Sequence, residues 1–340
     1  MTRGPAMTVS VRKSWRLAVP VVCALAAVGL AGCSPDSVTP GNSHVVVYAA
    51  VGASAANPGD TVAVVANENG KTGRPVTVGT LPSALALVPG AATLLVTVKA
   101  QNELVEVATA TGKVVGRIGV GLEPDAVAVT PDGTTALVAN FGDNTVTEVH
   151  LATRTVGRTV HVGGQPVSIA ITPDGRRALV ANYQDGTLTP LTVSSLAAGP
   201  PIPVGAGPVA VTVTSATEAL VADFQTSSIT PVALPSLVLL PPIPLGANPT
   251  GIESGPAGTV AWISAGYGIT PITFPGHAVG KAIPLGIPAG CIVVNRHGQA
   301  WVCSGNGGLV QVDLSAGRVL RTVAVGGIPS AAVVADTFGS

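Results

Sequence analysis

The chain has 340 residues with 17 basic and 17 acidic side chains, so its formal net charge is zero. Only 10% of the residues are charged while Gly (42) and Pro (29) are abundant, which excludes a highly charged disordered chain and argues against a nucleic-acid partner. Short Val-rich runs separated by Gly and Pro are typical of an all-β protein, and the length suffices to bury a core.

The N-terminus has the pattern of an export signal. Basic residues precede an apolar stretch at residues 17–32, which is short for a membrane span. The stretch ends in Leu30-Ala31-Gly32-Cys33, which resembles the lipobox of bacterial lipoproteins. That resemblance implies cleavage before Cys33 and attachment of a diacylglycerol to its thiol. The alternatives are an ordinary secretory signal with an accidental cysteine and an uncleaved membrane anchor.

A flexible tether is predicted after the signal peptide (residues 1–32). Residues 33–43 are polar and contain two prolines and a glycine. They would connect the lipid to a folded domain at residues 44–340. The predicted location is therefore the outer side of the cytoplasmic membrane or the cell envelope, with the membrane itself as one partner.

A glycine followed two or three residues later by a proline recurs along the rest of the chain. The pairs are Gly79/Pro82, Gly121/Pro124, Gly163/Pro166, Gly205/Pro208, Gly246/Pro249, Gly286/Pro288 and Gly326/Pro329. Successive prolines lie 42, 42, 42, 41, 39 and 41 residues apart, a period typical of four-stranded propeller blades. We expect each glycine to adopt a backbone conformation that other residues avoid, and each proline to stiffen the start of the innermost strand.

The two most regular units resemble the YVTN-type β-propeller repeats of bacterial surface proteins. The resemblance rests on Leu137-Val138-Ala139-Asn140, on Leu179-Val180-Ala181-Asn182, and on the Thr-Pro-Asp-Gly turns at residues 130–133 and 172–175. It extends over residues 44–340 and is strongest over residues 120–235, whereas later units depart from the pattern. The resemblance implies a propeller fold. Because the later units differ, it does not imply an equivalent site in every blade.

The two ends of the repeat region predict the number of blades. After Pro329 the chain has only one more strand, whereas three strand-like runs precede Gly79, at residues 44–50, 61–66 and 74–78. The last repeat would then supply the innermost strand of a blade whose other strands are N-terminal. This arrangement predicts an all-β, seven-bladed propeller that is closed without exposed sheet edges.

Two cysteines flank a predicted hairpin turn near the C-terminus. Cys291 and Cys303 lie on either side of residues 295–298, so they are expected on neighbouring strands. In an oxidising compartment they are predicted to form a disulfide. Two buried free thiols are the alternative, and metal binding by this pair is not expected.

Two sets of loops are expected to open on one face of the ring around the central channel. The loops before the innermost strands are small and nearly neutral, except for Glu123 and Asp125. Two such carboxylates suit cation binding or acid–base chemistry. The alternative is that both are simply exposed and solvated.

The loops between the second and third strands carry a repeated aromatic residue. Phe141, Tyr183 and Phe224 are spaced by 42 and 41 residues in a protein with only 3% aromatic residues. Their polar neighbours are Asp143, Asn144, Gln184, Asp185 and Gln225. Aromatic anchors beside adaptable polar groups are typical of binding surfaces, so these residues form a candidate binding face. Packing of the rings between blades is the alternative.

The sequence has no C-x-x-C-H haem attachment, no Gly-x-Ser-x-Gly nucleophile elbow and no phosphate-binding glycine loop. The histidines are His44, His150, His161, His277 and His297, and none is expected beside the acidic spot. We therefore predict a non-catalytic binding or scaffolding lipoprotein without cofactor or metal, whose partner is an envelope protein, a peptide or a glycan. The alternative is a propeller-type lactonase or lyase that uses Glu123 and Asp125.

Overall fold

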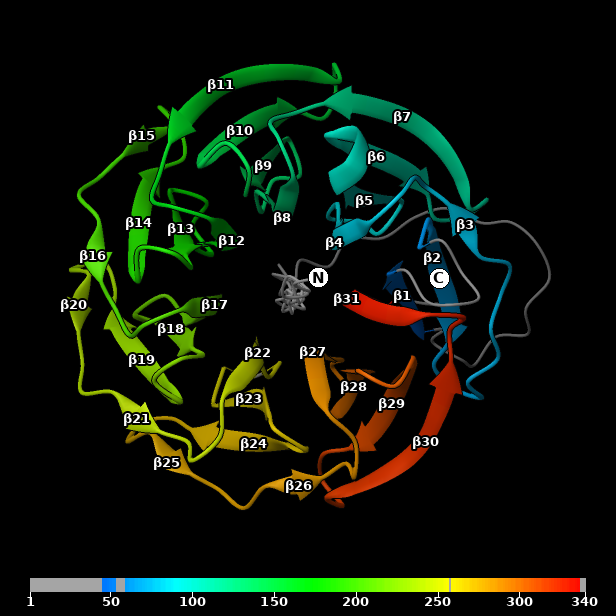
Figure 1. The fold of residues 1–340 in the computed structure, drawn as a ribbon, viewed down its shortest axis with the longest axis vertical. Coiled ribbons are helices and arrows are strands. Elements are labelled where there is room, and N and C mark those ends of the chain that lie inside the picture. The colour runs from blue at the N-terminus through cyan, green and yellow to red at the C-terminus, as the bar shows by residue number, and fades with distance from the viewer. Residues whose placement is uncertain (1–44, 53–58, 257, 337–340) are drawn as a thin grey trace, which may run out of the picture.

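The computed structural model describes residues 45–52, 59–256 and 258–336, which form a seven-bladed β-propeller (Figure 1). The predicted signal peptide (residues 1–32) and the predicted tether with Cys33 lie outside the described residues. Apart from the short 3-10 helix η1 (Lys99–Gln101), the regular elements in the described part are strands. That part contains no helix long and apolar enough to cross a membrane.

Each blade is a four-position antiparallel sheet whose innermost strand lies next to the channel. Blade 1 is β31-β1-β2-β3, and blades 2 to 7 follow in chain order. The innermost strands are β31 (Ile328–Asp336), β4 (Pro82–Leu87), β8 (Pro124–Val129), β12 (Pro166–Ile171), β17 (Pro208–Ser215), β22 (Pro249–Ser254) and β27 (Ala289–Val294). The second strands are β1 (Val45–Gly52), β5 (Thr93–Val98), β9 (Thr135–Asn140), β13 (Arg177–Asn182), β18 (Glu218–Asp223), β23 (Val260–Ala265) and β28 (Gln299–Ser304).

The third and outermost strands complete the blades. The third strands are β2 (Thr61–Ala66), β6 (Glu103–Ala108), β10 (Thr145–His150), β14 (Thr187–Thr192), β19 (Ser228–Ala233), β24 (Gly268–Thr273) and β29 (Gly308–Asp313). The outermost strands are β3 (Val76–Thr77), β7 (Lys113–Gly119), β11 (Thr155–His161) and β30 (Arg318–Ala324), and the split pairs β15 (Ala197–Ala198) with β16 (Ile202–Pro203), β20 (Val238–Leu239) with β21 (Ile243–Pro244), and β25 (Ala278–Val279) with β26 (Ile283–Pro284).

A repeated proline explains why the outermost strands of blades 4, 5 and 6 are split. The middle of the third strand carries Pro190, Pro231 or Pro271 in these blades. Proline has no N–H to donate to the outermost strand, so the ladder is interrupted there. At the same repeat position blades 2, 3 and 7 have Glu106, Glu148 and Gln311, and their outermost strands are continuous.

The ring is closed by pairing between the two ends of the domain. β1 lies antiparallel to β31, from Gly52 opposite Ile328 to Val45 opposite Asp336. The three N-terminal runs predicted from the sequence are β1, β2 and β3, and the strand after the last repeat is β31. The predicted number of blades and the predicted mode of closure are therefore both confirmed.

Apolar side chains fill the space between blades, and hydroxyl groups join neighbouring blades near the channel. The second strands are almost wholly buried because both of their faces pack against other blades. Among the innermost strands, the Ser83 hydroxyl donates to the Pro124 carbonyl at 2.7 Å. Thr250 donates to the Ala289 carbonyl at 2.8 Å, and Ser330 donates to the Pro82 carbonyl at 2.9 Å. The ring is thus held by polar contacts as well as by apolar burial.

The repeat glycine is required for close approach in the most regular blades, which differs from the expectation. Gly121, Gly163 and Gly205 do not have a positive φ. A Cβ atom on each would lie within 2.4 to 2.7 Å of the Cγ of Asn140, Asn182 or Asp223. The special backbone conformation does occur at repeat glycines elsewhere, for example at Gly79 (φ 132°) and Gly326 (φ 84°).

A disulfide joins the first two strands of blade 7. Cys291 on β27 and Cys303 on β28 are bonded, and their Cα atoms are 5.0 Å apart. Both residues are buried. The hairpin turn that the sequence predicts at residues 295–298 connects these two strands.

Gly163→Ala should destabilise the propeller, because the new methyl group must displace the buried Asn182 side chain. We expect a loss of about 1 to 3 kcal/mol in the free energy of unfolding, measured by urea denaturation. Gly119→Ala is the matched control, since it also adds a Cβ to a glycine without positive φ but meets nothing within 4 Å. Equal loss in both variants would contradict the close-approach explanation.

Candidate functional site

Two sets of loops meet on one face of the ring, which we call the loop face. The leading loops run into the innermost strands, and the middle loops join the second to the third strands. In blade 3 the N–H of Phe141 donates to the Glu123 carbonyl, and that of Gly142 donates to the Leu122 carbonyl, both at 3.0 Å. The hairpins between the other strands lie on the opposite side, the turn face.

Several residues of the predicted binding face hold these loops together. The Asp143 carboxylate accepts the N–H of Leu122 at 2.6 Å, and Asp185 accepts that of Gly164 at 2.7 Å. Asn144 accepts the N–H of Gln165 in the next blade at 2.8 Å. These three side chains therefore shape the loop face, whereas Gln184 and Gln225 are exposed on it.

Asp125 is buried in an ion pair. Only 2% of its side chain is exposed, and its Oδ1 lies 2.5 Å from the Nζ of Lys99 in blade 2. Burial raises the pKa of Asp125 to about 6, although the Lys99 charge lowers it and Glu123 adds to the rise. This ion pair links blades 2 and 3, and removing Lys99 would leave the buried Asp125 carboxylate without its partner.

The structure does not bring Glu123 and Asp125 together as an exposed acidic spot. Glu123 is exposed with a positive φ of 49°, whereas Asp125 is buried beneath the loop. The expectation of two neighbouring solvated acids is wrong for Asp125, because its side chain turns to Lys99. The two carboxylates therefore do not share one opening in which a substrate could lie between them.

The three repeated aromatic residues are half-buried. Tyr183 and Phe224 pack against an apolar cluster that includes Val209 and Ile252, yet each keeps part of its ring open. The Tyr183 hydroxyl accepts a hydrogen bond from the exposed Gln225 at 3.4 Å. The rings thus combine the two roles that the sequence left open, packing between blades and contributing to the surface.

Lys99 is a loop-face residue that the sequence reasoning missed. It occupies in blade 2 the repeat position of Phe141, Tyr183 and Phe224, being 42 residues before Phe141. Its Nζ lies 5.4 Å from the centroid of the Phe141 ring, close enough for a cation–π contact. The signal that could have found it was the repeat spacing, extended one blade toward the N-terminus.

Exposed apolar side chains are placed unevenly over the molecule. Leu122 (52% exposed), Leu81 and Ile328 lie at the leading loops, and Tyr267 (68% exposed) lies on the middle loop of blade 6. The other large exposed apolar residues are on outermost strands: Val115, Val156, Val238, Leu239, Val279 and Val319. Among the described residues, none is in a turn of the opposite face.

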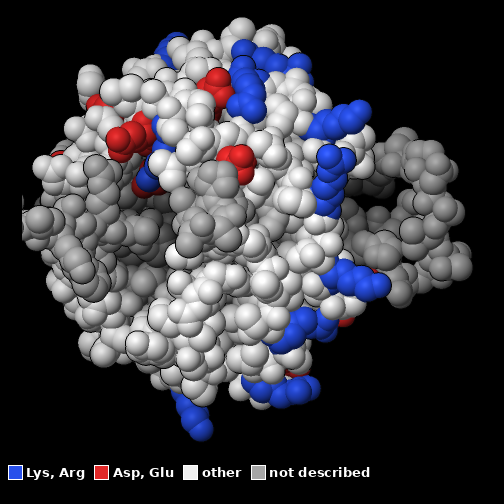
Figure 2. Space-filling model, turned by 45° about the vertical axis from the view of Figure 1, so that its right-hand side comes forward, with Lys and Arg blue, Asp and Glu red and all other residues white. Residues whose placement is uncertain are grey.

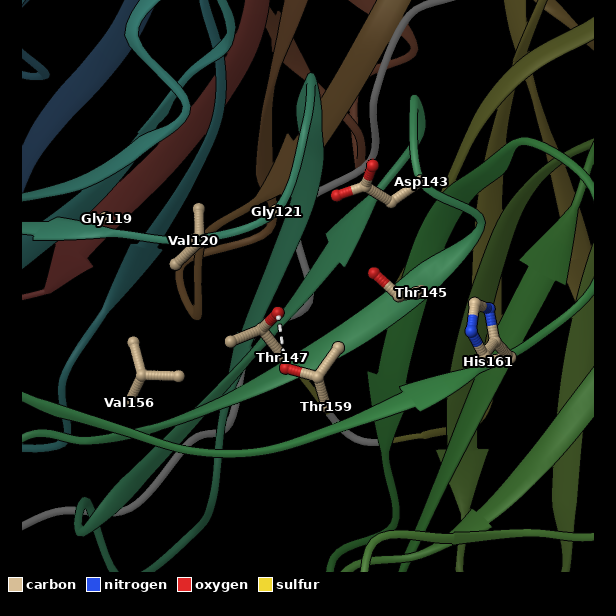
Figure 3. A pocket seen from close by; sticks show the side chains of 9 residues that line it. All are labelled: Gly119, Val120, Gly121, Asp143, Thr145, Thr147, Val156, Thr159 and His161. Carbon is tan, nitrogen blue, oxygen red and sulfur yellow. Dashed lines mark hydrogen bonds between the residues drawn. The ribbon is translucent and has the colours of Figure 1, made fainter.

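A hollow of about 390 Å³ lies on blade 3 beside its leading loop (Figure 3). Thr145, Thr147, Thr159 and His161 line it, with Asp143 at its loop end. Thr147 and Thr159 face each other at 3.3 Å. Because the Asp143 carboxylate already caps the leading loop, the polar side-chain groups that this hollow offers are the threonine hydroxyl groups and the His161 imidazole.

Buried carboxyl groups also occur in blades 5 and 6. Asp223 stands where Asn140 and Asn182 stand in blades 3 and 4, and it accepts the Thr230 hydroxyl at 2.5 Å. Burial raises its pKa to about 7, against the effect of hydrogen bonds from Thr230 and Gly205. Burial likewise raises the pKa of Glu253 in blade 6. No group of three or more His, Cys, Asp or Glu suited to a metal ion occurs in the described part of the chain.

No protein-family model and no curated protein matches the chain. Solved structures do resemble it. Hydrazine synthase of Kuenenia stuttgartiensis aligns with a TM-score of 0.67 and 19% identity over 74% of this chain and 88% of that one. A functionally unknown protein from Desulfotomaculum acetoxidans aligns with a TM-score of 0.75 and 16% identity over 87% and 100%. Dihydro-heme d1 dehydrogenase NirN aligns with a TM-score of 0.62 and 13% identity over 85% and 74%. At such identities the likeness shows a shared fold alone.

Asp223→Asn should stabilise the protein at pH 8 and have much less effect at pH 4. The pKa of Asp223 is raised from 3.8 to about 7 in the folded state, so ionisation opposes folding. The wild type therefore loses stability as pH rises from about 4 to about 7, whereas the asparagine variant does not lose this part. We expect a gain on the order of 2 to 4 kcal/mol at pH 8 in urea denaturation.

The reciprocal variant Asn182→Asp is the control in the neighbouring blade. It places a carboxyl group at the equivalent buried position, beside Thr187 and Thr189. We expect it to lose stability over the same pH range. A pH-independent difference between Asp223→Asn and the wild type would show that burial of this carboxyl group has no such effect.

Proposed function

We propose that this chain is a lipid-anchored, non-catalytic binding protein of the bacterial cell envelope, and that its partner binds the loop face. The main observation behind this proposal is where the exposed apolar side chains lie. Four of them are on the loop face, and among the described residues none is in a turn of the opposite face. Three of them, Ile328, Leu81 and Leu122, lie at the leading loops of the neighbouring blades 1, 2 and 3, and exposed apolar side chains that gather on one face favour an interaction surface there.

Further features support a binding surface. The half-buried rings of Tyr183 and Phe224 pack against the apolar cluster beneath them, and that of Phe141 lies beside Lys99, so these rings would lose little freedom on binding. Exposed Gln184 and Gln225 can adapt their hydrogen bonds to a partner. The resemblance of the repeats to YVTN-type repeats supports a location at the cell surface, and so does the lipobox-like sequence Leu30-Ala31-Gly32-Cys33.

A lactonase or lyase activity receives less support from the geometry. It would require Glu123 and Asp125 to act on one substrate. Asp125 is instead buried against Lys99, and Glu123 points from the surface of the loop. The binding function therefore accounts for more of the loop face than catalysis does.

The proposal predicts that Leu122→Ser combined with Tyr267→Ser abolishes partner binding without unfolding the protein. Both side chains are exposed, so their loss should change stability by less than about 0.5 kcal/mol each. Partners would be captured by photo-crosslinking in living cells and identified by mass spectrometry. We expect recovery of the loop-face partner to fall by about tenfold or more.

Val238→Ser combined with Val279→Ser is the matched control, because it removes equally exposed apolar side chains from β20 and β25 on the outer rim. This control should recover the same partners as the wild type. If both double variants lose the partners equally, or neither does, the loop face is not the binding surface.

A further inference from the structure

Basic side chains are concentrated on one sector of the ring, on blades 7, 1 and 2. We call this sector the basic edge and define it by Lys71, Arg74, Lys113, Arg296, Arg318 and Arg321. These residues lie at the turn-face ends or on the outer flank of the three blades, which are neighbours in the ring. Figure 2 shows Lys and Arg gathered along the right-hand edge of the molecule, with acidic atoms mostly to their left.

The cations of the basic edge outnumber the carboxylates around them. The described carboxylates at the turn-face ends of these blades are Glu68 and Asp313, whereas Glu103 and Glu106 on β6 are paired with Arg117 and Arg154. Asp313 accepts hydrogen bonds within its own turn, from Ser315 and Ala316. The guanidinium of Arg321 donates to the Glu68 carbonyl oxygen, a contact that leaves its charge uncompensated by that bond. The sector is therefore positive although the whole chain is neutral.

The loop face has the opposite sign. It carries the carboxylates of Asp60, Glu123, Asp143 and Asp185. Its cation Lys99 is occupied by the buried Asp125. A negatively charged surface would consequently attract the basic edge and repel the loop face, and so would orient the disc.

The chain enters the propeller at the centre of this positive sector. Val45, the first residue of β1, lies opposite Asp336, which is the turn-face end of blade 1. Cys33 precedes Val45 by 12 residues, a length of chain that spans at most about 40 Å and about 20 Å on average if flexible. A lipid on Cys33 would therefore keep the basic edge close to the membrane at a high effective concentration.

We propose that the basic edge is a docking surface for an anionic phospholipid membrane, and that this contact holds the loop face outward, away from the lipid. The orientation rests on the proposed function for its anchor, whereas the contact itself depends only on the folded domain. Each exposed Lys or Arg near an anionic bilayer contributes a small attraction that salt weakens. In this arrangement the basic edge contacts the membrane, and the loop face binds the partner.

The test uses residues 34–340, which contain the whole described propeller but neither the apolar stretch at residues 17–32 nor the acylation site Cys33, and vesicles with or without phosphatidylglycerol. We expect co-sedimentation with vesicles that contain phosphatidylglycerol, little with phosphatidylcholine alone, and release by high salt. Adding Lys71→Glu and Arg318→Glu should weaken binding by about tenfold or more. Both residues are exposed, so the variant should keep its fold.

The matched control is Arg158→Glu with Lys281→Glu, which changes the net charge equally on exposed positions of blades 3 and 6. The control should bind within about twofold of the parent chain. Equal weakening in both double variants, or binding that ignores phosphatidylglycerol, would overturn the proposal. Mass spectrometry of the mature N-terminus tests the lipid on Cys33 separately, so failure of the anchor and failure of the docking surface can be told apart.

Discussion

Pairing between β1 and β31 is the constraint on which the rest of the molecule depends. Blades 2 to 7 are each continuous in sequence, but blade 1 is assembled from strands at opposite ends of the domain. Without that contact the ring would expose two sheet edges, between blades 7 and 2. When this pairing is present, the second strand of each blade is covered on both faces. The leading and middle loops of all blades then lie on one side of the disc. The closing blade also places the start of the domain on the turn face, among the residues of the basic edge.

The site arises where individual blades depart from their repeat. The position after the second strand carries Lys99 in blade 2 and aromatic residues in blades 3 to 5. Because neighbouring blades bring these positions close together, Lys99 contacts the Phe141 ring, and Gln225 reaches the Tyr183 hydroxyl. In the same way Asp223 replaces the amide of Asn140 and Asn182 with a carboxyl group, and burial raises the pKa of this group to about 7. The repeated sequence positions therefore form the scaffold, and the positions that differ between blades provide the charged and aromatic side chains of the candidate site.

The fold was predictable because its main signals are local or periodic. The proline spacing, the tight turns and the three N-terminal runs each required only the chain itself, and together they predicted seven blades. The burial of Asp125 was not predictable in this way, because it depends on Lys99 in the neighbouring blade. The close approach of Gly163 to Asn182 was also not predictable, because the two residues are 19 positions apart and come together only in the folded sheet. Partial burial of the aromatic rings likewise depends on how adjacent blades pack.

Native-state hydrogen exchange of β1 and β31 tests the closure of the ring most directly. Terminal strands ordinarily fray and exchange by local opening. If their pairing holds the whole ring, the amides of β1 and β31 must be as strongly protected as those of the innermost strand β12 in blade 4 and exchange only with global unfolding. Protection of β1 and β31 that is weaker by orders of magnitude would show that blade 1 opens on its own, and would contradict this account.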